Sequence, residues 1–374
     1  MRVLWIAPAF YPAINYGGPT FSGLGLCRGL AAAGVDLRVL TTNDGGYGER
    51  LQVDTKAENV LEGFRIRYCP GLIPRAFSSE ILARLPGAIH WADVVHLTSV
   101  YNFTTVPSLL ACRVQGKATV WSPRGALQRW EGSSRLGLKA IFEATCRGVA
   151  PARLVLHATS DEEARESLER FPRAQARVVP NGVDLPERVL EKAPSKALRI
   201  LFLGRLDIKK GLDVLLKAAA IAHQTFDLDF TLNIAGTGTD GYVQSLKTLA
   251  ETLGIQERVR FAGYVNDSQK GQVFADADVL VVPSHTENFA RVIPEALAHA
   301  VPVIASRGTP WSGLAERGAG WWVENTPQAL AEVLSAARAA PLKSMGEIGR
   351  AWAIKEFAWG AVTEKMLKLY EQVV

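Results

Sequence analysis

The sequence predicts an α/β protein made of two doubly wound domains, each with a parallel sheet. Three observations support this fold class: the length, the alternation of short apolar runs with helical segments, and a charged, proline-containing break near the middle. At 374 residues the chain is long for one hydrophobic core, so two domains are expected. With 48% hydrophobic and 21% charged residues, it has the composition of an ordinary globular protein.

The expected strands are runs rich in Val, Ile and Leu, several of them without polar alternation. A strand buried on both faces has this pattern, which indicates a parallel sheet covered by helices. Because such runs alternate with helical segments in both halves, each half is expected to form one Rossmann-like domain. The candidate strands are Val3–Pro8, Leu37–Thr42, Phe64–Cys69, Val94–Leu97, Ala118–Trp121, Leu154–Ala158, Val178–Pro180, Ile200–Gly204, Phe230–Ala235, Val259–Gly263, Val279–Pro283 and Val303–Ala305.

The domain boundary is expected at 186–196, a charged segment with two prolines and no strand pattern. The predicted domains are therefore 1–185 and 197–357. Apolar residues at helical spacing near the end predict an amphipathic final helix at 358–374.

Several classes of protein are disfavoured by composition. No apolar run reaches the ~18 to 20 residues that a membrane span needs, and the first residues indicate a buried strand rather than a signal peptide. Cys27, Cys69, Cys112 and Cys146 are scattered without metal-ligand spacing, so we expect buried free thiols, no metal site and a cytoplasmic location. The net charge of +5 is too small to indicate nucleic-acid binding.

Basic residues are concentrated between positions 124 and 153. They are Arg124, Arg129, Arg135, Lys139, Arg147 and Arg153, against only Glu131 and Glu143. One interpretation is a solvated helical face. The other is attraction to an anionic acceptor or to an anionic membrane surface.

Two strand-to-helix turns are candidate phosphate sites. Gly17, Gly18 and Pro19 precede a helical segment whose first turn would offer free N–H groups to an anion, although a tight turn without ligand is the favoured interpretation of these three residues alone. The second turn follows Gly204 and carries Arg205 and Lys210. These side chains should emerge at the carboxyl end of a parallel strand, where ligands of such sheets bind. Arginine offers a planar fork to phosphate and lysine a point charge.

A pair of acidic residues surrounds the loop after the strand at 279–283. Glu287 lies in the loop, while Glu295 with Pro294 is expected in the first turn of a short helix. Carboxylates accept hydrogen bonds from sugar and ribose hydroxyls. Solvated surface acids, or the paired carboxylates of a glycosidase, are the alternatives.

Together these segments resemble glycosyltransferase family 4, whose members share the GT-B fold of two Rossmann-like domains facing a cleft, with a last helix that crosses back to the first domain. The resemblance covers nearly the whole chain and rests on the order and spacing of its motifs. They are Gly17-Gly18-Pro19, Pro180-Asn181-Gly182-Val183-Asp184, Gly204-Arg205-Leu206 with Lys210-Gly211, Gly236-Thr237-Gly238, Glu287 with Glu295, Pro302-Val303-Ile304-Ala305-Ser306, and the ending with Phe357-Ala358-Trp359 and Leu369-Tyr370. Ser122–Leu127 and Thr309–Trp311 further resemble a bacterial subgroup associated with polysaccharide assembly.

The resemblance implies a role for each motif. Arg205 and Lys210 would neutralise the diphosphate of the donor, Glu295 would bind ribose hydroxyls, and Glu287 would approach the transferred hexose. Arg205, Lys210 and Glu287 are thus the expected catalytic residues. The remaining expected donor contacts are Gly17, Gly18, Gly236, Tyr264 and Val265 beside the nucleobase, Asn288, Phe289, Ala290 and Arg291.

Three positions depart from the family pattern. Ala290 stands where glycine is usual, which would alter the backbone at the sugar. Ala300 also replaces a glycine at a helix end, which concerns stability. Arg124 stands where many members carry an acceptor-side histidine, which suggests that it meets an anionic acceptor or the departing phosphate.

The implied function is a retaining, metal-independent transfer of a hexose from a UDP- or GDP-sugar to a saccharide or lipid-linked acceptor, without a cofactor. Basic side chains and helix N-termini would supply the positive charge that a metal supplies elsewhere. The rivals are a sugar-nucleotide epimerase of the same fold and a non-enzymatic two-domain binding protein.

Overall fold

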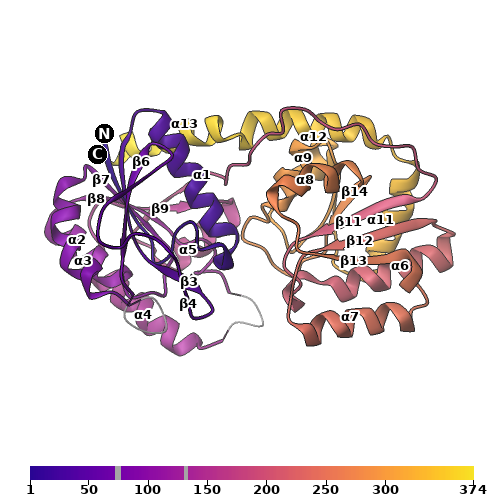
Figure 1. Ribbon diagram of the computed structural model, residues 1–374, viewed down its shortest axis with the longest axis horizontal. Helices are drawn as coiled ribbons and strands as arrows, with labels where there is room; N and C mark the ends of the chain where they lie inside the picture. Colours follow the sequence, from indigo (N-terminus) through magenta and orange to yellow (C-terminus); the bar gives the residue numbers. More distant parts are fainter. Residues whose placement is uncertain (72–76, 130–133) are drawn as a thin grey trace. The chain divides into compact units, whose positions relative to one another are not determined.

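The computed structural model describes residues 1–71, 77–129 and 134–374. The chain forms two compact units, one made of Met1–Gly182 with Trp359–Val374 and the other of Val183–Ala358. The segment 186–196, where the linker was expected, contains no helix or strand and belongs to the second unit. Figure 1 shows the course of the chain through both units.

The first unit is built on an eight-stranded sheet with the order β10-β9-β8-β7-β1-β2-β6-β5, in which the pair β5–β6 is antiparallel. The strands are β1 (Arg2–Ile6), β2 (Asp36–Thr42), β5 (Asn59–Leu61), β6 (Phe64–Cys69), β7 (Val94–Thr98), β8 (Ala118–Ser122), β9 (Leu154–Ala158) and β10 (Gln175–Val178). A separate hairpin pairs β3 (Asp44–Gly46) with β4 (Glu49–Arg50).

Alternate residues of these strands enter different cores. Trp5, Val94 and Val120 pack with α1 (Gly18–Ala32) and α13 (Trp359–Val373) on one face. Leu4, Leu97 and Trp121 pack on the other face with α2 (Ser79–Trp91), α3 (Thr105–Val114) and α4 (Leu136–Val149). α5 (Asp161–Arg170) packs against β9 and β10, and a short 3-10 turn, Ile14–Tyr16, precedes α1.

The last helix packs directly on the first one, so the two ends of the chain share one core. α13 lies beside α1, as the yellow and indigo helices show in Figure 1. A Cβ atom at Gly25 of α1 would lie 2.0 Å from the Trp359 ring, so only glycine permits this approach. Val362, Met366 and Tyr370 of α13 are buried in the same core.

The second unit has an all-parallel, six-stranded sheet with the order β13-β12-β11-β14-β15-β16. Its strands are β11 (Leu198–Leu203), β12 (Phe230–Ala235), β13 (Val259–Gly263), β14 (Val279–Val282), β15 (Val303–Ser306) and β16 (Gly320–Val323). Its helices are α6 (Leu212–Phe226), α7 (Asp240–Thr252), α8 (Asp267–Ala275), α9 (Val292–Ala298), α10 (Gly313–Arg317), α11 (Pro327–Ala339) and α12 (Leu342–Phe357), with 3-10 turns at Ile208–Lys210 and Gln256–Arg258. Each unit is thus a doubly wound, Rossmann-like domain, as the sequence predicts.

The sequence prediction was wrong at one strand and incomplete at others. The strand expected at Val178–Pro180 is instead β10, which ends at Val178. This edge strand carries exposed Gln175 and Arg177, so it lacks the apolar run by which buried strands are recognised. β16 was not expected, nor were the short strands β3, β4 and β5.

Candidate functional site

In the second sheet the strand order reverses between β11 and β14: β12 and β13 lie beyond β11, whereas β15 and β16 lie beyond β14. The loops that follow β11 and β14 therefore start side by side at the carboxyl ends of the strands and then lead away from each other. Ligands of such sheets bind at this point. Arg205 lies exposed in the loop after β11, and Lys210 ends the 3-10 turn of the same loop. Gly211 has φ 66°, and a Cβ atom there would lie 2.0 Å from the carbonyl oxygen of Pro283 after β14. Glycine thus brings the two loops into contact.

Glu287, from the loop after β14, forms an ion pair with Lys210. Its Oε1 atom also accepts a hydrogen bond from the Ser284 hydroxyl (2.8 Å), and its backbone N–H donates to the carbonyl oxygen of Gly308 (2.8 Å). The Glu287 side chain is only 11% exposed. The structure therefore brings together the lysine and the carboxylate that the sequence placed in one donor site.

Glu295 lies in the first turn of α9, as expected, and is held by two cations. Arg291 Nη2 lies 2.9 Å from Glu295 Oε1, and Lys270 Nζ of α8 lies 3.3 Å from Glu295 Oε2. Burial lowers the pKa of Lys270, but Glu295 and Asp267 more than offset this, so its pKa is raised overall. The sequence analysis missed Lys270, because a lone lysine in a helix carries no motif.

The loop Asn288–Arg291 takes its shape from an aromatic cluster below it. Phe289 is buried and packs against Trp311 and Phe357, and the Trp311 indole N–H donates to the Phe289 carbonyl oxygen. This gives Trp311 of the Thr309–Trp311 motif a structural role. Ala290 has φ 56°, in the left-handed region, so the alanine adopts a conformation that glycine favours.

Gly236 and Tyr264 lie at the same edge of the second sheet, after β12 and β13. The Gly236 N–H donates to the carbonyl oxygen of Gly263 (2.7 Å), which joins the two strand ends. Tyr264 is 64% exposed, while Val265 is partly buried against the core. The structure thus collects Arg205, Lys210, Gly236, Tyr264, Val265, Glu287, Glu295 and the loop 288–291 at one edge of the second sheet.

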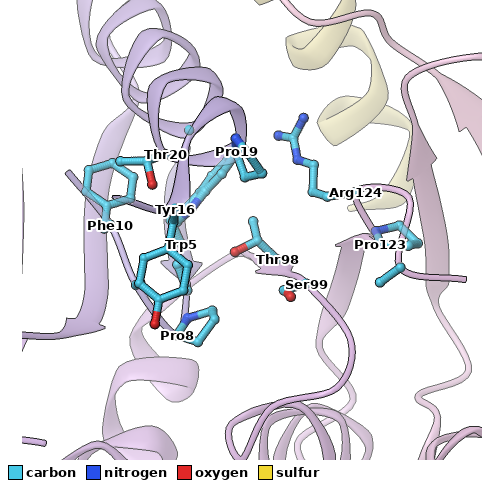
Figure 2. Close-up of a pocket in the computed structure, with 14 residues that line it drawn as sticks. Trp5, Pro8, Phe10, Tyr16, Pro19, Thr20, Thr98, Ser99, Pro123 and Arg124 are labelled. Atoms are coloured by element: carbon cyan, nitrogen blue, oxygen red, sulfur yellow. The ribbon is translucent and has the colours of Figure 1, made fainter. Parts of the chain in front are cut away.

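The other predicted residues lie in the first unit. Arg124 lines a pocket of about 190 Å³, and Gly17 and Gly18 stand in the sequence between its lining residues Tyr16 and Pro19. Its lining comes from the ends of β1, β7 and β8 and from the start of α1. Figure 2 shows Thr98 and Ser99 between Pro123 and Arg124 on one side and Trp5, Tyr16 and Pro19 on the other. This sheet also reverses its strand order between β1 and β7, so the pocket again lies at a switch point.

Two features of this pocket concern its predicted residues. Gly17 is the N-cap of α1 and has φ 69°. It directly follows Tyr16, which lines the pocket, and precedes the first residue of α1. Arg124 has φ 56°, and its Nη1 atom donates to Asn181 Oδ1 (2.6 Å). Asn181 was noticed only as part of a motif, and its contact with Arg124 was not predictable from sequence because 57 residues separate the two.

The basic segment 124–153 does not form a uniform solvated face. Arg129 is ion-paired with Glu143, a buried residue of α4 that also accepts a hydrogen bond from the Tyr101 hydroxyl. Glu131 lies outside the described residues. Leu136, Leu138 and Ile141 of α4 are exposed by 52%, 67% and 66%.

Two family models match consecutive parts of the chain. "Glycosyltransferase Family 4" matches residues 16–187, and "Glycosyl transferases group 1" matches residues 187–351.

The chain belongs to glycosyltransferase family 4.

Relatives within this family are similar along most of the chain. A D-inositol 3-phosphate glycosyltransferase of Kineococcus radiotolerans is 31% identical over 64% of this chain and 60% of its own length. A phosphatidyl-myo-inositol mannosyltransferase of Mycobacterium leprae is 32% identical over 58% of both chains. These two matches thus span about three fifths of the relatives' length. A D-inositol 3-phosphate glycosyltransferase of Catenulispora acidiphila is 27% identical over 100% of this chain and 96% of its own.

Solved structures show the same fold over the full chain. Sucrose-phosphate synthase of Thermosynechococcus elongatus has a TM-score of 0.75 at 21% identity, and covers 100% of this chain and 98% of its own. The Anabaena protein HepE, solved in complex with UDP, has a TM-score of 0.76 at 17% identity, with 100% of both chains covered.

Among residues 1–71, 77–129 and 134–374, no group of three or more His, Cys, Asp or Glu is placed to hold a metal ion. No helix in this described part is long and apolar enough to cross a bilayer. All four cysteines are buried and free.

Proposed function

We propose that this chain transfers a hexose from a nucleotide-diphosphate sugar to a saccharide or lipid-linked acceptor, with retention of configuration, in the assembly of a cell-surface polysaccharide or oligosaccharide. The observation that carries the proposal is the cluster at the second sheet's switch point. There Lys210 forms an ion pair with Glu287 from the loop after β14, and Arg205 is exposed in the same loop as Lys210. The doubly paired Glu295 follows in α9.

The chemistry fits these charges. The bond between the anomeric carbon and the leaving phosphate oxygen breaks, and the nucleotide diphosphate gains negative charge as it departs. Cations that are already in place stabilise such charge more than solvent does. Lys210 is fixed by Glu287, so its position is set before substrate binds. The acceptor hydroxyl attacks from the same face, and the leaving phosphate takes its proton, so no enzyme nucleophile is needed.

The donor is a UDP- or GDP-sugar. HepE was solved with UDP and with UDP-glucose, which supports a uridine donor for a chain of this fold. Glu295 would accept hydrogen bonds from ribose hydroxyls, with Lys270 and Arg291 holding the carboxylate in place. The backbone beside Tyr264 and Val265 would meet the base.

The acceptor would enter the first-unit pocket, where Arg124 favours an anionic group. Aromatic and apolar residues such as Trp5 and Tyr16 line most of the rest of this pocket. A sugar ring offers an apolar face to such a lining, and a guanidinium binds a phosphate or carboxylate by paired hydrogen bonds. The pocket therefore suits an acceptor that carries both a sugar ring and a phosphate or carboxylate group.

Peripheral attachment to an anionic membrane is part of the proposal, and α4 supports it. The helix turns Glu143 inward and exposes Leu138 and Ile141, the reverse of an ordinary amphipathic helix. Glu143 is its only acidic residue, while Arg135, at its N-cap, and Arg147 add exposed positive charge. Exposed apolar side chains among cations bind anionic interfaces.

Donor turnover is the test of the function. UDP-, GDP- and ADP-sugars are first screened by thermal shift, since a ligand that binds the folded state raises its melting temperature. Each donor that binds is then incubated with and without acceptor. Acceptor-dependent release of the nucleotide diphosphate supports the proposal. Conversion of the donor sugar without acceptor would instead indicate an epimerase, and binding without turnover would indicate a binding protein.

The membrane part is tested by flotation with vesicles. Wild-type protein should bind vesicles of phosphatidylglycerol and phosphatidylcholine, but not vesicles of phosphatidylcholine alone. Leu138→Gln combined with Ile141→Gln should abolish this binding, whereas Val60→Gln, at a residue 78% exposed on β5, should leave it intact. Equal binding by all variants would remove α4 from the proposal.

A further inference from the structure

Four buried polar side chains form a continuous hydrogen-bonded row beneath the first-unit pocket. His96 of β7, Ser122 of β8 and His157 of β9 lie side by side on one face of the sheet, and Tyr370 reaches them from α13. The Tyr370 hydroxyl lies 2.5 Å from His96 Nδ1, and His96 Nε2 lies 2.6 Å from Ser122 Oγ. Ser122 Oγ lies 2.6 Å from His157 Nδ1, and His157 Nε2 lies 2.9 Å from the carbonyl oxygen of Val179.

The row has one direction. A carbonyl oxygen only accepts, so His157 Nε2 carries the hydrogen and donates to Val179. Burial lowers the pKa of His157 to about 3 and lowers that of His96, with Arg124 adding to both shifts, so both rings are neutral. His157 Nδ1 therefore accepts from Ser122, whose oxygen accepts from His96 Nε2. His96 Nδ1 then accepts from the Tyr370 hydroxyl. Every bond in the row has one donor.

The row ends on a backbone carbonyl, so it has no outlet for a proton and is not a relay. Instead, the row fixes the two chain segments that carry Arg124 and its hydrogen-bond partner Asn181. Ser122 lies two residues before Arg124, and Val179 lies two residues before Asn181, which accepts the hydrogen bond from Arg124 (2.6 Å). His96 also supports the pocket from below, because the Trp5 ring packs on it with the ring centroids 4.0 Å apart.

We propose that Tyr370, through His96, Ser122 and His157, positions Arg124 in the first-unit pocket, so that the last helix of the chain sets the geometry of the acceptor side. These four are positioning residues: none of them lines the pocket, and we expect each to act through Arg124. The inference rests on the proposed function only in taking Arg124 as the residue that meets the acceptor or the departing phosphate.

Tyr370→Phe is the decisive variant because it keeps the ring and removes the hydroxyl. Without that donor, His96 Nδ1 is left buried with no hydrogen-bond partner, so the His96 ring and the Ser122 and His157 side chains bonded beyond it lose their fixed positions. A small misplacement of a substrate-positioning group costs rate steeply, so kcat/KM for the acceptor should fall about 10-fold to 100-fold, while the Kd for the nucleotide diphosphate stays unchanged. His157→Gln, which keeps a donor and an acceptor, should retain more activity than His157→Leu.

The matched control is Tyr68→Phe, which also removes a buried tyrosine hydroxyl bond, here to the carbonyl oxygen of Tyr11 (2.5 Å). Neither Tyr68 nor Tyr11 lines the pocket, so kcat/KM for the acceptor should be unchanged. A loss equal to that of Tyr370→Phe would show that the effect is only structural, and would overturn the inference.

A double-mutant cycle tests whether Tyr370 acts through Arg124. In an Arg124→Ala background, Tyr370→Phe should cause no further loss, because coupled residues are not additive. Additive losses would overturn the proposal. An NMR readout separates it from the function: the Arg124 Nε–H signal should shift in Tyr370→Phe and not in Tyr68→Phe, even if no transfer is detected. An unshifted signal would also overturn it.

Discussion

At the scale of single residues, the fold holds the two cations of the donor loop differently. Arg205 is exposed, whereas Lys210 is partly buried and fixed to Glu287. We expect Arg205→Ala and Lys210→Ala each to slow turnover by about 10²-fold or more, because the loss of one such donor costs about 3 to 4 kcal/mol in the transition state. Steady-state kinetics measure this. Lys217→Ala, on the exposed surface of α6, is the control and should be neutral. Wild-type rates in both site variants would remove the phosphate assignment.

The two carboxylates of the site should differ in what they do. Glu295→Gln should mainly weaken binding of the free nucleotide diphosphate, and Glu287→Gln should spare that binding and lower kcat. An interaction equal in ground and transition states changes KM, and one that strengthens in the transition state changes kcat. The ion pair between Lys210 and Glu287 gives a second reason for a lower kcat, because Glu287→Gln removes the charge that holds Lys210 in its position. Calorimetry beside kinetics decides between the roles, and the opposite pattern would reverse them.

Sequence reasoning predicted the position of candidate site residues that have a local signature, and it gave no indication of a neighbour such as Lys270 that has none. Arg205, Lys210, Glu287 and Glu295 stand at strand-to-helix junctions, so their place at the sheet edge followed from the order of elements. Lys270 reaches Glu295 from a different helix, 25 residues away. Such a contact is created by tertiary packing, and no spacing rule reports it.

At the scale of elements, the end of α9 contains a correctable strain. His299 caps the helix and Ala300 follows with φ 56°, the left-handed conformation in which a side chain is unfavourable. Ala300→Gly should raise the free energy of unfolding by about 0.5 to 1 kcal/mol, measured by urea denaturation. Ala336→Gly, at an exposed position inside α11, is the matched control and should lower it by about 1 kcal/mol. Loss of stability in Ala300→Gly would contradict the strain.

The elements that the sequence predicted best are those buried on both faces. β14 is a continuous apolar run, and β1, β7 and β9 are largely apolar, because helices cover both sides of each sheet. The edge strand β10 is mostly exposed, and the hairpin β3–β4 is short and made of polar residues and glycine, so packing and turn geometry, rather than hydrophobicity, determine where they form. Short helices such as α10, with five residues, are equally weak signals.

At the scale of the whole molecule, the two units share one feature: in each sheet the strand order reverses beside the candidate site residues. In the first unit this point lies between β1 and β7, at the pocket, and in the second between β11 and β14, at the charged cluster. The sequence predicted both units, because alternation of strands and helices reports topology. It did not predict the polar row under the pocket, since His96 and His157 each stand alone in an apolar strand and Tyr370 lies 274 residues from His96 in the sequence.

Stability should fall as the pH is lowered below about 6.5, before most carboxylates titrate. Burial is the main cause that lowers the pKa of His157 to about 3 and of His299 to about 4, and it also lowers that of His96. Above pH 6.5 neither state binds these protons. Below it the unfolded chain binds protons that the folded chain does not, so unfolding is favoured by up to about 1.4 kcal/mol per pH unit for each histidine.

Urea unfolding at pH 7, 6 and 5 measures this loss. Asp93 and Asp278, whose pKa values are lowered by their arginine partners, keep their charge across that window and so do not contribute to the slope. The His157→Gln variant should show a shallower dependence on pH than the wild type, whatever its absolute stability. A free energy of unfolding that stays constant from pH 7 to 5 would show that the buried histidines do not control acid sensitivity.

The charge balance of the whole candidate donor site determines whether turnover needs a metal ion. A departing nucleotide diphosphate needs positive charge, which a divalent cation or the protein itself must supply. Here the carboxylates nearest the site are already engaged, Glu287 by Lys210 and Glu295 by Lys270 and Arg291, while Arg205 and Lys210 bring two positive charges to the same edge. A metal would have to displace these ion pairs to bind. Turnover should therefore be unchanged after dialysis against EDTA, with a known Mg²⁺-dependent transferase losing activity in parallel as the control. Loss of activity on chelation, restored by Mg²⁺ or Mn²⁺, would show that the side-chain cations are insufficient and that a metal completes the site.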